Sequence, residues 1–132
     1  GSQSGWGAPC AAAAAAGIAF GRVVETGAHF ESARAVAEGR ADIAALDAAT
    51  LRLIRRWGDV AHGLREIGRT PPTPAPAYVT AGDVDPAPYL SALQEAFEAM
   101  PAEVRVDLGL RAILPVDRAA YAALPVPPAP PR

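Results

Sequence analysis

Apolar residues in the first sixty positions recur at helical spacing in three segments. Residues 8–16 are rich in alanine, with Pro9 in the first turn and Gly17 directly after them. Residues 31–38 place Ala33, Val36 and Ala37 on one helical face and are followed by a glycine. Residues 48–57 also carry apolar residues at helical spacing. These patterns predict three helices.

Four other segments have the pattern expected of short strands. Residues 22–25, 64–70 and 78–80 are rich in β-branched or large apolar residues, and residues 43–46 are a continuous apolar run typical of a buried parallel strand. Strands that alternate with helices indicate parallel βαβ units. The predicted fold class is therefore α/β, a parallel-type sheet flanked by helices.

A proline-rich stretch at residues 71–76 interrupts regular structure, and the pattern changes after it. Residues 89–100 form the clearest amphipathic helix, with Leu90, Leu93, Phe97 and Met100 in one stripe. Short helical segments are predicted at residues 103–110 and 119–124. We divide the chain into an α/β lobe at 1–74, a C-terminal segment with helices at 75–124, and a proline-rich tail at 125–132.

Charge and cysteine content exclude several classes of function. The net charge is −2, all twelve basic residues are arginine, and the longest basic cluster is Arg55-Arg56. Nucleic-acid binding is not expected, because it requires many cations that neutralise phosphates. The single cysteine, Cys10, and two distant histidines do not make a zinc site, and we predict no metal and no cofactor. No apolar run reaches transmembrane length, and we expect no export signal within the chain.

Polar residues gather where the first helix begins. Ser2, Gln3 and Ser4 precede Gly5, which lets the backbone approach a ligand closely. Free amides of a first helical turn point along the axis, and the helix dipole favours an anion there. The alternative is an ordinary helix cap at a chain end.

A second polar group surrounds the next helix start and the end of the predicted strand at 43–46. Thr26 and His29 precede the helix and Ser32 lies in its first turn, while Asp47 follows the strand. His29 can donate to an oxyanion, or it can be a cap or a surface histidine. Asp47 can cap the helix at residue 48, or accept a proton from a ligand. An ionised carboxylate has only acceptors, so it would select a ligand with a P–OH group and repel sulfate.

Serine, histidine and aspartate together also suggest the residue types of a hydrolytic triad. The sequence contains no Gly-x-Ser-x-Gly nucleophile elbow, and no Walker or dinucleotide-binding glycine motif. We therefore predict that the chain is not an enzyme.

Three segments in order resemble the phosphate/phosphonate substrate-binding proteins of ABC transporters, which have the type 2 periplasmic-binding fold. The segments are residues 2–6 (Ser-Gln-Ser-Gly-Trp), 25–29 (Glu-Thr-Gly-Ala-His) and 32–47, and the resemblance extends over most of residues 2–124. It implies that Ser2, Gln3, Ser4 and His29 hold a phosphorus oxyanion and that Asp47 faces the rest of the ligand. Thr26 and Ser32 are secondary candidates.

The resemblance also implies partners and a location. A solute-binding protein of this kind binds phosphate, phosphite or phosphonate outside the cytoplasm, in the periplasm or anchored to the membrane, and delivers it to a membrane permease. The family's first lobe has no counterpart here, so we expect one lobe plus the C-terminal segment, weak ligand binding, and self-association through the stripe at 89–100. Two alternatives share the fold: a ligand-sensing domain of a signalling protein, and an enzyme of the pyrimidine-synthesis type, for which Cys10 alone gives no support.

Overall fold

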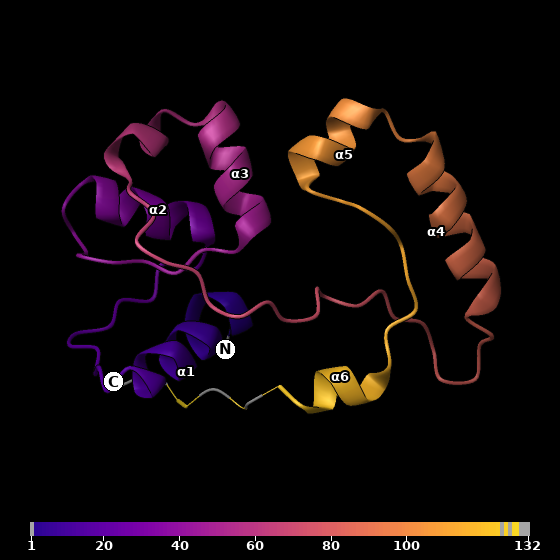
Figure 1. Cartoon of the computed structure of the whole chain (residues 1–132), viewed down its shortest axis with the longest axis horizontal. Helices are drawn as coiled ribbons and strands as arrows, with labels where there is room; N and C mark the ends of the chain where they lie inside the picture. Colours follow the sequence, from indigo (N-terminus) through magenta and orange to yellow (C-terminus); the bar gives the residue numbers. More distant parts are fainter. Residues whose placement is uncertain (1, 125, 127, 130–132) are drawn as a thin grey trace. The chain divides into compact units, whose positions relative to one another are not determined.

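The computed structural model describes residues 2–124, 126, 128 and 129, and its regular structure is helical (Figure 1). The α-helices are α1 (Ala8–Ala15), α2 (His29–Ala37), α3 (Ala48–Trp57), α4 (Ala87–Ala99), α5 (Ala102–Leu108) and α6 (Arg118–Ala122). A π-helical turn, η1 (Gln3–Gly7), precedes α1, and a 3-10 turn, η2 (Asp59–Gly63), follows α3. The helices predicted from the sequence are confirmed, with ends that differ by a few residues.

The predicted α/β class is wrong, because no β-strand occurs among the described residues. Residues 22–25, 43–46, 64–70 and 78–80 are irregular and form no sheet. Several of their apolar side chains are exposed to solvent: Val24 is 48% exposed, Ile43 51% and Val79 89%. Strand stability comes mainly from cross-strand neighbours and burial, which a short apolar run does not itself provide. The predicted parallel sheet flanked by helices is therefore replaced by helices joined by irregular segments.

Close contacts divide the chain into two compact units, which are described separately. The first contains Gly1–Pro71 and the second is Pro72–Leu124. The domains proposed at 1–74, 75–124 and 125–132 stay a prediction.

The first unit is built around contacts among α2, α3 and η2. Ala33, Ala35 and Ile54 are its buried apolar residues among those described, with Ala33 fully buried and Ile54 only 4% exposed. Gly63 sets the approach of η2 to α2, because a Cβ at this position would lie 2.8 Å from the Cβ of Ala37. Small residues thus let these elements approach closely around a core of few large side chains.

Two glycines with a left-handed backbone conformation lie at the two ends of α2. Gly27, with φ of 80°, allows the chain to turn immediately before the helix. Gly39, with φ of 71°, ends the helix, and the amide of Arg40 then donates to the carbonyl of Ala35 at 2.8 Å. Such a bond satisfies carbonyls that the helix end would leave without a partner. The predicted stop at Gly39 is confirmed.

The second unit packs α4 through its predicted stripe. Phe97 is buried, the other three members of the stripe are half-buried, and the guanidinium of Arg105 lies 5.2 Å from the centroid of the Phe97 ring. Two polar contacts hold irregular segments within this unit: Gln94 donates to the carbonyl of Ile113, and the Tyr121 hydroxyl donates to the carbonyl of Ala75. Self-association through the stripe stays a prediction.

Within the described part of the chain, we found no helix that combines the length and the apolar character needed to cross a lipid bilayer.

Candidate functional site

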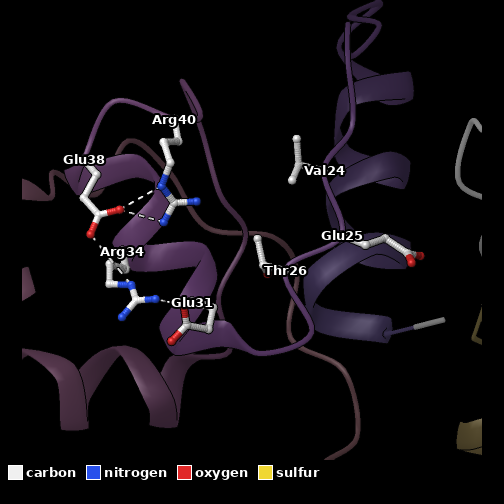
Figure 2. Close-up of a pocket in the computed structure, with 7 residues that line it drawn as sticks. All are labelled: Val24, Glu25, Thr26, Glu31, Arg34, Glu38 and Arg40. Carbon is white, nitrogen blue, oxygen red and sulfur yellow. Dashed lines mark hydrogen bonds and ion pairs between the residues drawn. The ribbon is translucent and has the colours of Figure 1, made fainter.

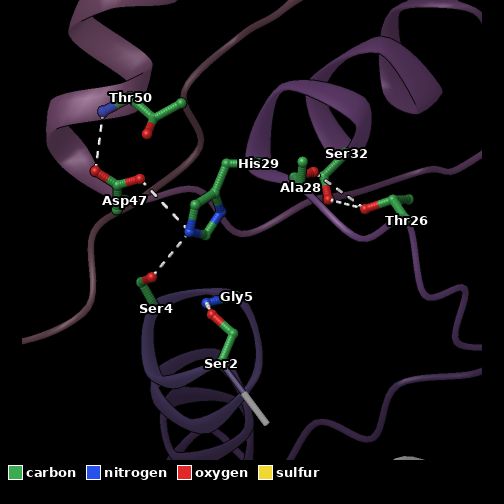
Figure 3. Close-up of polar contacts among 9 residues, drawn as sticks. All are labelled: Ser2, Ser4, Gly5, Thr26, Ala28, His29, Ser32, Asp47 and Thr50. Atoms are coloured by element: carbon green, nitrogen blue, oxygen red, sulfur yellow. Dashed lines mark hydrogen bonds and ion pairs between the residues drawn. The ribbon is translucent and has the colours of Figure 1, made fainter.

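The imidazole of His29 is the centre of a polar cluster formed by three separate segments (Figure 3). Ser4 Oγ of η1 lies 3.1 Å from His29 Nε2, and Asp47 Oδ2 lies 3.5 Å from the same nitrogen. His29 is the first residue of α2, and Asp47 directly precedes α3. We call Ser4, His29 and Asp47 the His29 cluster. The structure thus brings together three of the seven residues predicted for the site.

Asp47 has a structural role that fixes its position in the cluster. Its backbone is extended, and its Oδ1 accepts the amide of Thr50 at 2.9 Å, which caps the first turn of α3. The capping interpretation of Asp47 is therefore confirmed. Because one carboxylate oxygen holds the helix, the other is directed toward His29. Contact of Asp47 with a ligand stays a prediction.

The neighbouring carboxylate determines how the hydrogens of the cluster are arranged. An ionised carboxylate can only accept, so Asp47 favours the tautomer of His29 with hydrogen on Nε2. The contact of 3.1 Å between Ser4 Oγ and Nε2 permits either direction, and with this tautomer Ser4 Oγ accepts from the same N–H. Its own hydroxyl hydrogen is left for another acceptor, such as an anionic ligand.

The geometry differs from that of a hydrolytic triad. In a triad the serine and the carboxylate contact opposite nitrogens of the imidazole, so that the carboxylate orients the histidine that activates the serine. Here Ser4 and Asp47 share Nε2. The cluster therefore gives no support to Ser4 as a nucleophile.

Competing effects act on the pKa of Asp47. Partial burial raises it, but the hydrogen bonds from the side chain and backbone of Thr50, the charge of His29 and the backbone of Ala49 together hold it below the ordinary value of 3.8. The Asp47 side chain keeps 33% of its surface exposed and that of His29 24%. Asp47 is thus a carboxylate at neutral pH, in a site that solvent can reach.

Residues Ser2, Gln3 and Gly5 shape the turn that carries Ser4. Ser2 Oγ accepts the amide of Gly5 at 3.0 Å, and the carbonyl of Gln3 accepts the amide of Ala8. A Cβ at Gly5 would lie 3.1 Å from Ser2 Oγ and 3.4 Å from Cε1 of His29. Glycine at this position therefore lets the imidazole lie directly against the turn. Ser2 acts as a helix cap, and a ligand role for Ser2 and Gln3 stays a prediction.

Thr26 and Ser32 form a second polar pair. Their hydroxyl oxygens are 2.6 Å apart, and Thr26 Oγ1 also donates to the carbonyl of Ala28 at 3.2 Å (Figure 3). Each hydroxyl has one hydrogen, so Ser32 donates to Thr26 while Thr26 donates to Ala28. These two hydroxyls link the turn before α2 to its first turn, and they help to position His29.

The N-terminus of α2 has no side-chain cap, unlike the N-terminus of α3. Ala28, the N-cap of α2, has no side chain that could accept from the helix, whereas Asp47 caps α3. Amides of a first helical turn have no acceptor within the helix, and the positive end of the helix dipole lies there. His29 therefore lies where the backbone itself favours an anion.

A shallow surface depression of about 480 Å³ lies on another face of α2 (Figure 2). Its lining residues are Val24, Glu25, Thr26, Glu31, Arg34, Glu38 and Arg40. Arg34 pairs with Glu31 at 2.6 Å, and Arg40 pairs with Glu38 at 2.7 Å. The sequence reasoning did not single out these arginines. The lining thus has three carboxylates and only two guanidinium groups, both already paired with a carboxylate. This balance of charge does not favour an anionic ligand.

No part of the described chain brings together three histidine, cysteine, aspartate or glutamate side chains in a way that could hold a metal ion.

Two substitutions of Asp47 distinguish the effect of losing the helix cap from the effect of losing the charge. Asp47→Ala should lower the free energy of unfolding by about 0.5–2 kcal/mol, whereas Asp47→Asn should retain most of the cap, because asparagine caps helices as well as aspartate does. Since the folded pKa of Asp47 is lowered, its charged form stabilises the protein above pH 3.8. That contribution is lost as the pH falls through the folded pKa. Urea unfolding at neutral and acidic pH checks both expectations. Equal destabilisation by the two variants at neutral pH would contradict the capping role.

Comparison with models of protein families finds a match. The model of a protein family described as "ABC transporter, phosphonate, periplasmic substrate-binding protein" matches residues 1–121. No curated protein and no solved structure matches the chain.

Proposed function

The chain belongs to the family of periplasmic substrate-binding proteins for phosphonate of ABC transporters, and from this membership we propose that its His29 cluster binds a phosphorus oxyanion. Proteins of this family are binding components of transporters and not a class of enzymes. The observation that carries the proposal is the position of Ser4 and Asp47 on one nitrogen of His29, beside the N-terminus of α2.

The donors of the cluster suit an oxyanion. A ligand oxygen would receive the hydroxyl hydrogen of Ser4 and compete with Ser4 for the N–H of His29. Hydrogen bonds to an ionised acceptor are shorter and about twice as strong as neutral ones. First-turn amides of α2 add a favourable potential without contributing a side chain.

Asp47 would decide which oxyanion binds. Hydrogen phosphate, phosphite and phosphonates carry or can carry a P–OH group that donates to its carboxylate, and an aminoalkyl phosphonate adds an ammonium group. Sulfate has no such hydrogen at neutral pH, so it would meet only repulsion from Asp47. We therefore propose phosphate, phosphite or phosphonate as the ligand class.

Exposure of the cluster limits its affinity. Each charge-assisted hydrogen bond contributes about 1.5–3 kcal/mol, while association itself costs several kcal/mol. Three or four such bonds leave roughly −4 kcal/mol, which corresponds to a dissociation constant of about 1 mM. Binding experiments on this chain accordingly need ligand concentrations well above that value.

A thermal-shift panel tests the ligand class. Phosphate, phosphite, methylphosphonate and aminoethylphosphonate should each raise the melting temperature of the chain at neutral pH more than sulfate does at equal ionic strength. Asp47→Asn keeps the helix cap but removes the charge, so this variant should lose much of the discrimination against sulfate. Equal stabilisation of the unsubstituted chain by sulfate and phosphate would contradict the proposal.

Delivery to a membrane permease is the function that this binding would serve. The family is periplasmic and acts with ABC transporters. We propose that the chain presents its ligand to the permease of such a transporter outside the cytoplasm. Ligand-dependent stimulation of ATP hydrolysis by a reconstituted transporter would test this role.

A further inference from the structure

Trp6 lies beside the described part of the C-terminal tail, although 122 positions separate the two in sequence. The indole Nε1 of Trp6 donates to the carbonyl of Pro128 at 2.7 Å. The ring of Phe20 lies on the same unit, with its centroid 6.3 Å from that of Trp6 and an angle of 38° between the rings.

The chemistry of this contact is that of polyproline recognition. Residues 125–132 contain five prolines, which favour an extended polyproline conformation. A polyproline segment makes no internal hydrogen bonds, so its carbonyl oxygens are free to accept from another group. The indole N–H can only donate, and aromatic rings provide flat surfaces for proline. Domains that bind proline-rich peptides use this combination.

The turn that carries Trp6 also carries Ser4. The amides of Trp6 and Gly7 both donate to the carbonyl of Ser2, at 3.1 and 3.0 Å, so the residue that carries the indole is bonded within this short π-helical turn. A contact that fixes the indole therefore also restrains the turn. A preformed polyproline segment loses little conformational entropy when it docks, which favours such a contact.

We propose that Trp6 and Phe20 form a docking site for a proline-rich segment, which the chain's own Pro128 engages and which restrains the turn bearing Ser4. The occupant is the tail of the same molecule. The docking contact itself rests on Trp6, Phe20 and Pro128, so it can be tested without a ligand at the His29 cluster.

Fluorescence of Trp6 tests the docking. The other tryptophan, Trp57, is 74% exposed, and Trp57→Phe makes Trp6 the sole emitter. In that background, removal of residues 125–132 should shift the emission to longer wavelength and increase quenching by acrylamide. A synthetic peptide with the sequence of residues 125–132 should reverse both changes, whereas a peptide with its prolines replaced by alanine should not. Far-UV circular dichroism checks that the helices are retained.

A variant of the untruncated chain provides a second, independent test. Pro128→Gly keeps the carbonyl acceptor but removes the ring and the polyproline preference, so it should increase quenching of Trp6. Pro76→Gly changes a proline of the other proline-rich stretch, in the second unit, and should leave Trp6 unchanged. Unaltered emission and quenching of Trp6 in both the truncated chain and Pro128→Gly would overturn the proposal, as would failure of the peptide to restore them.

Discussion

Replacement of Ile54 by alanine is expected to lower the free energy of unfolding of the chain by about 2–5 kcal/mol. Ile54 is 4% exposed and is the largest of the buried apolar side chains described in this unit, where the others are Ala33 and Ala35. Truncation removes apolar contacts and leaves a cavity that the small neighbours cannot fill. A small domain has only several kcal/mol of net stability, so this variant should be partly unfolded under native conditions.

Two matched variants identify the origin of the loss. Ile54→Val keeps most of the side chain and should cost about 0.5–1.5 kcal/mol. Ile67→Ala makes the same deletion at a residue that is 69% exposed, and it should stay within about 0.5 kcal/mol of the unsubstituted chain. Both tryptophans lie in the first unit, so urea unfolding followed by tryptophan emission reports on this unit. A core role for Ile54 is excluded if Ile54→Ala and Ile67→Ala unfold at the same urea concentration.

Replacement of His29 by alanine is expected to weaken binding of inorganic phosphate by about 10- to 100-fold, which corresponds to the loss of one charge-assisted hydrogen bond of about 1.5–3 kcal/mol. The substitution removes the donor that faces the ligand. It also removes the group that holds Ser4 and Asp47 together, at 3.1 and 3.5 Å from one nitrogen. Starting from millimolar affinity, binding by the variant should be undetectable in a phosphorus NMR titration.

The chain contains its own control for this experiment. His62 is the other histidine and lies exposed in η2, outside the His29 cluster. His62→Ala should bind phosphate as the unsubstituted chain does, and circular dichroism should show that both variants retain their helices. If His29→Ala and His62→Ala give the same titration curve as the unsubstituted chain, the site is not at His29.

The sequence determined the helices because their signals are local. The segment at residues 48–57 has helical spacing and an aspartate before it, and α3 begins and ends at Ala48 and Trp57. Gly39 ends α2, since glycine takes the left-handed conformation that closes the helix. Sequence also indicated that Ser4, His29 and Asp47 lie at helix starts, which is where the structure has them.

Sequence alone failed where the outcome depends on distant residues. The apolar run at residues 43–46 predicts a buried strand, yet Ile43 is 51% exposed and no strand is present among the described residues. A run of apolar residues indicates only that the segment favours burial. Whether it becomes a strand depends on a neighbouring strand, and the local pattern contains no information about that partner.

Sequence by itself fixed which residues begin and end helices and which family the chain resembles, because caps, glycines and motifs act within a few positions. Only the tertiary structure decided that Ser4 and Asp47 meet on one nitrogen of His29, that Thr26 and Ser32 bond to each other, and that Trp6 contacts Pro128. The longest of these contacts closes a loop across nearly the whole chain, at an entropic cost that packing of separate segments must offset. The periodicity of residues along the sequence does not show whether packing between distant segments exceeds the entropic cost of bringing them together.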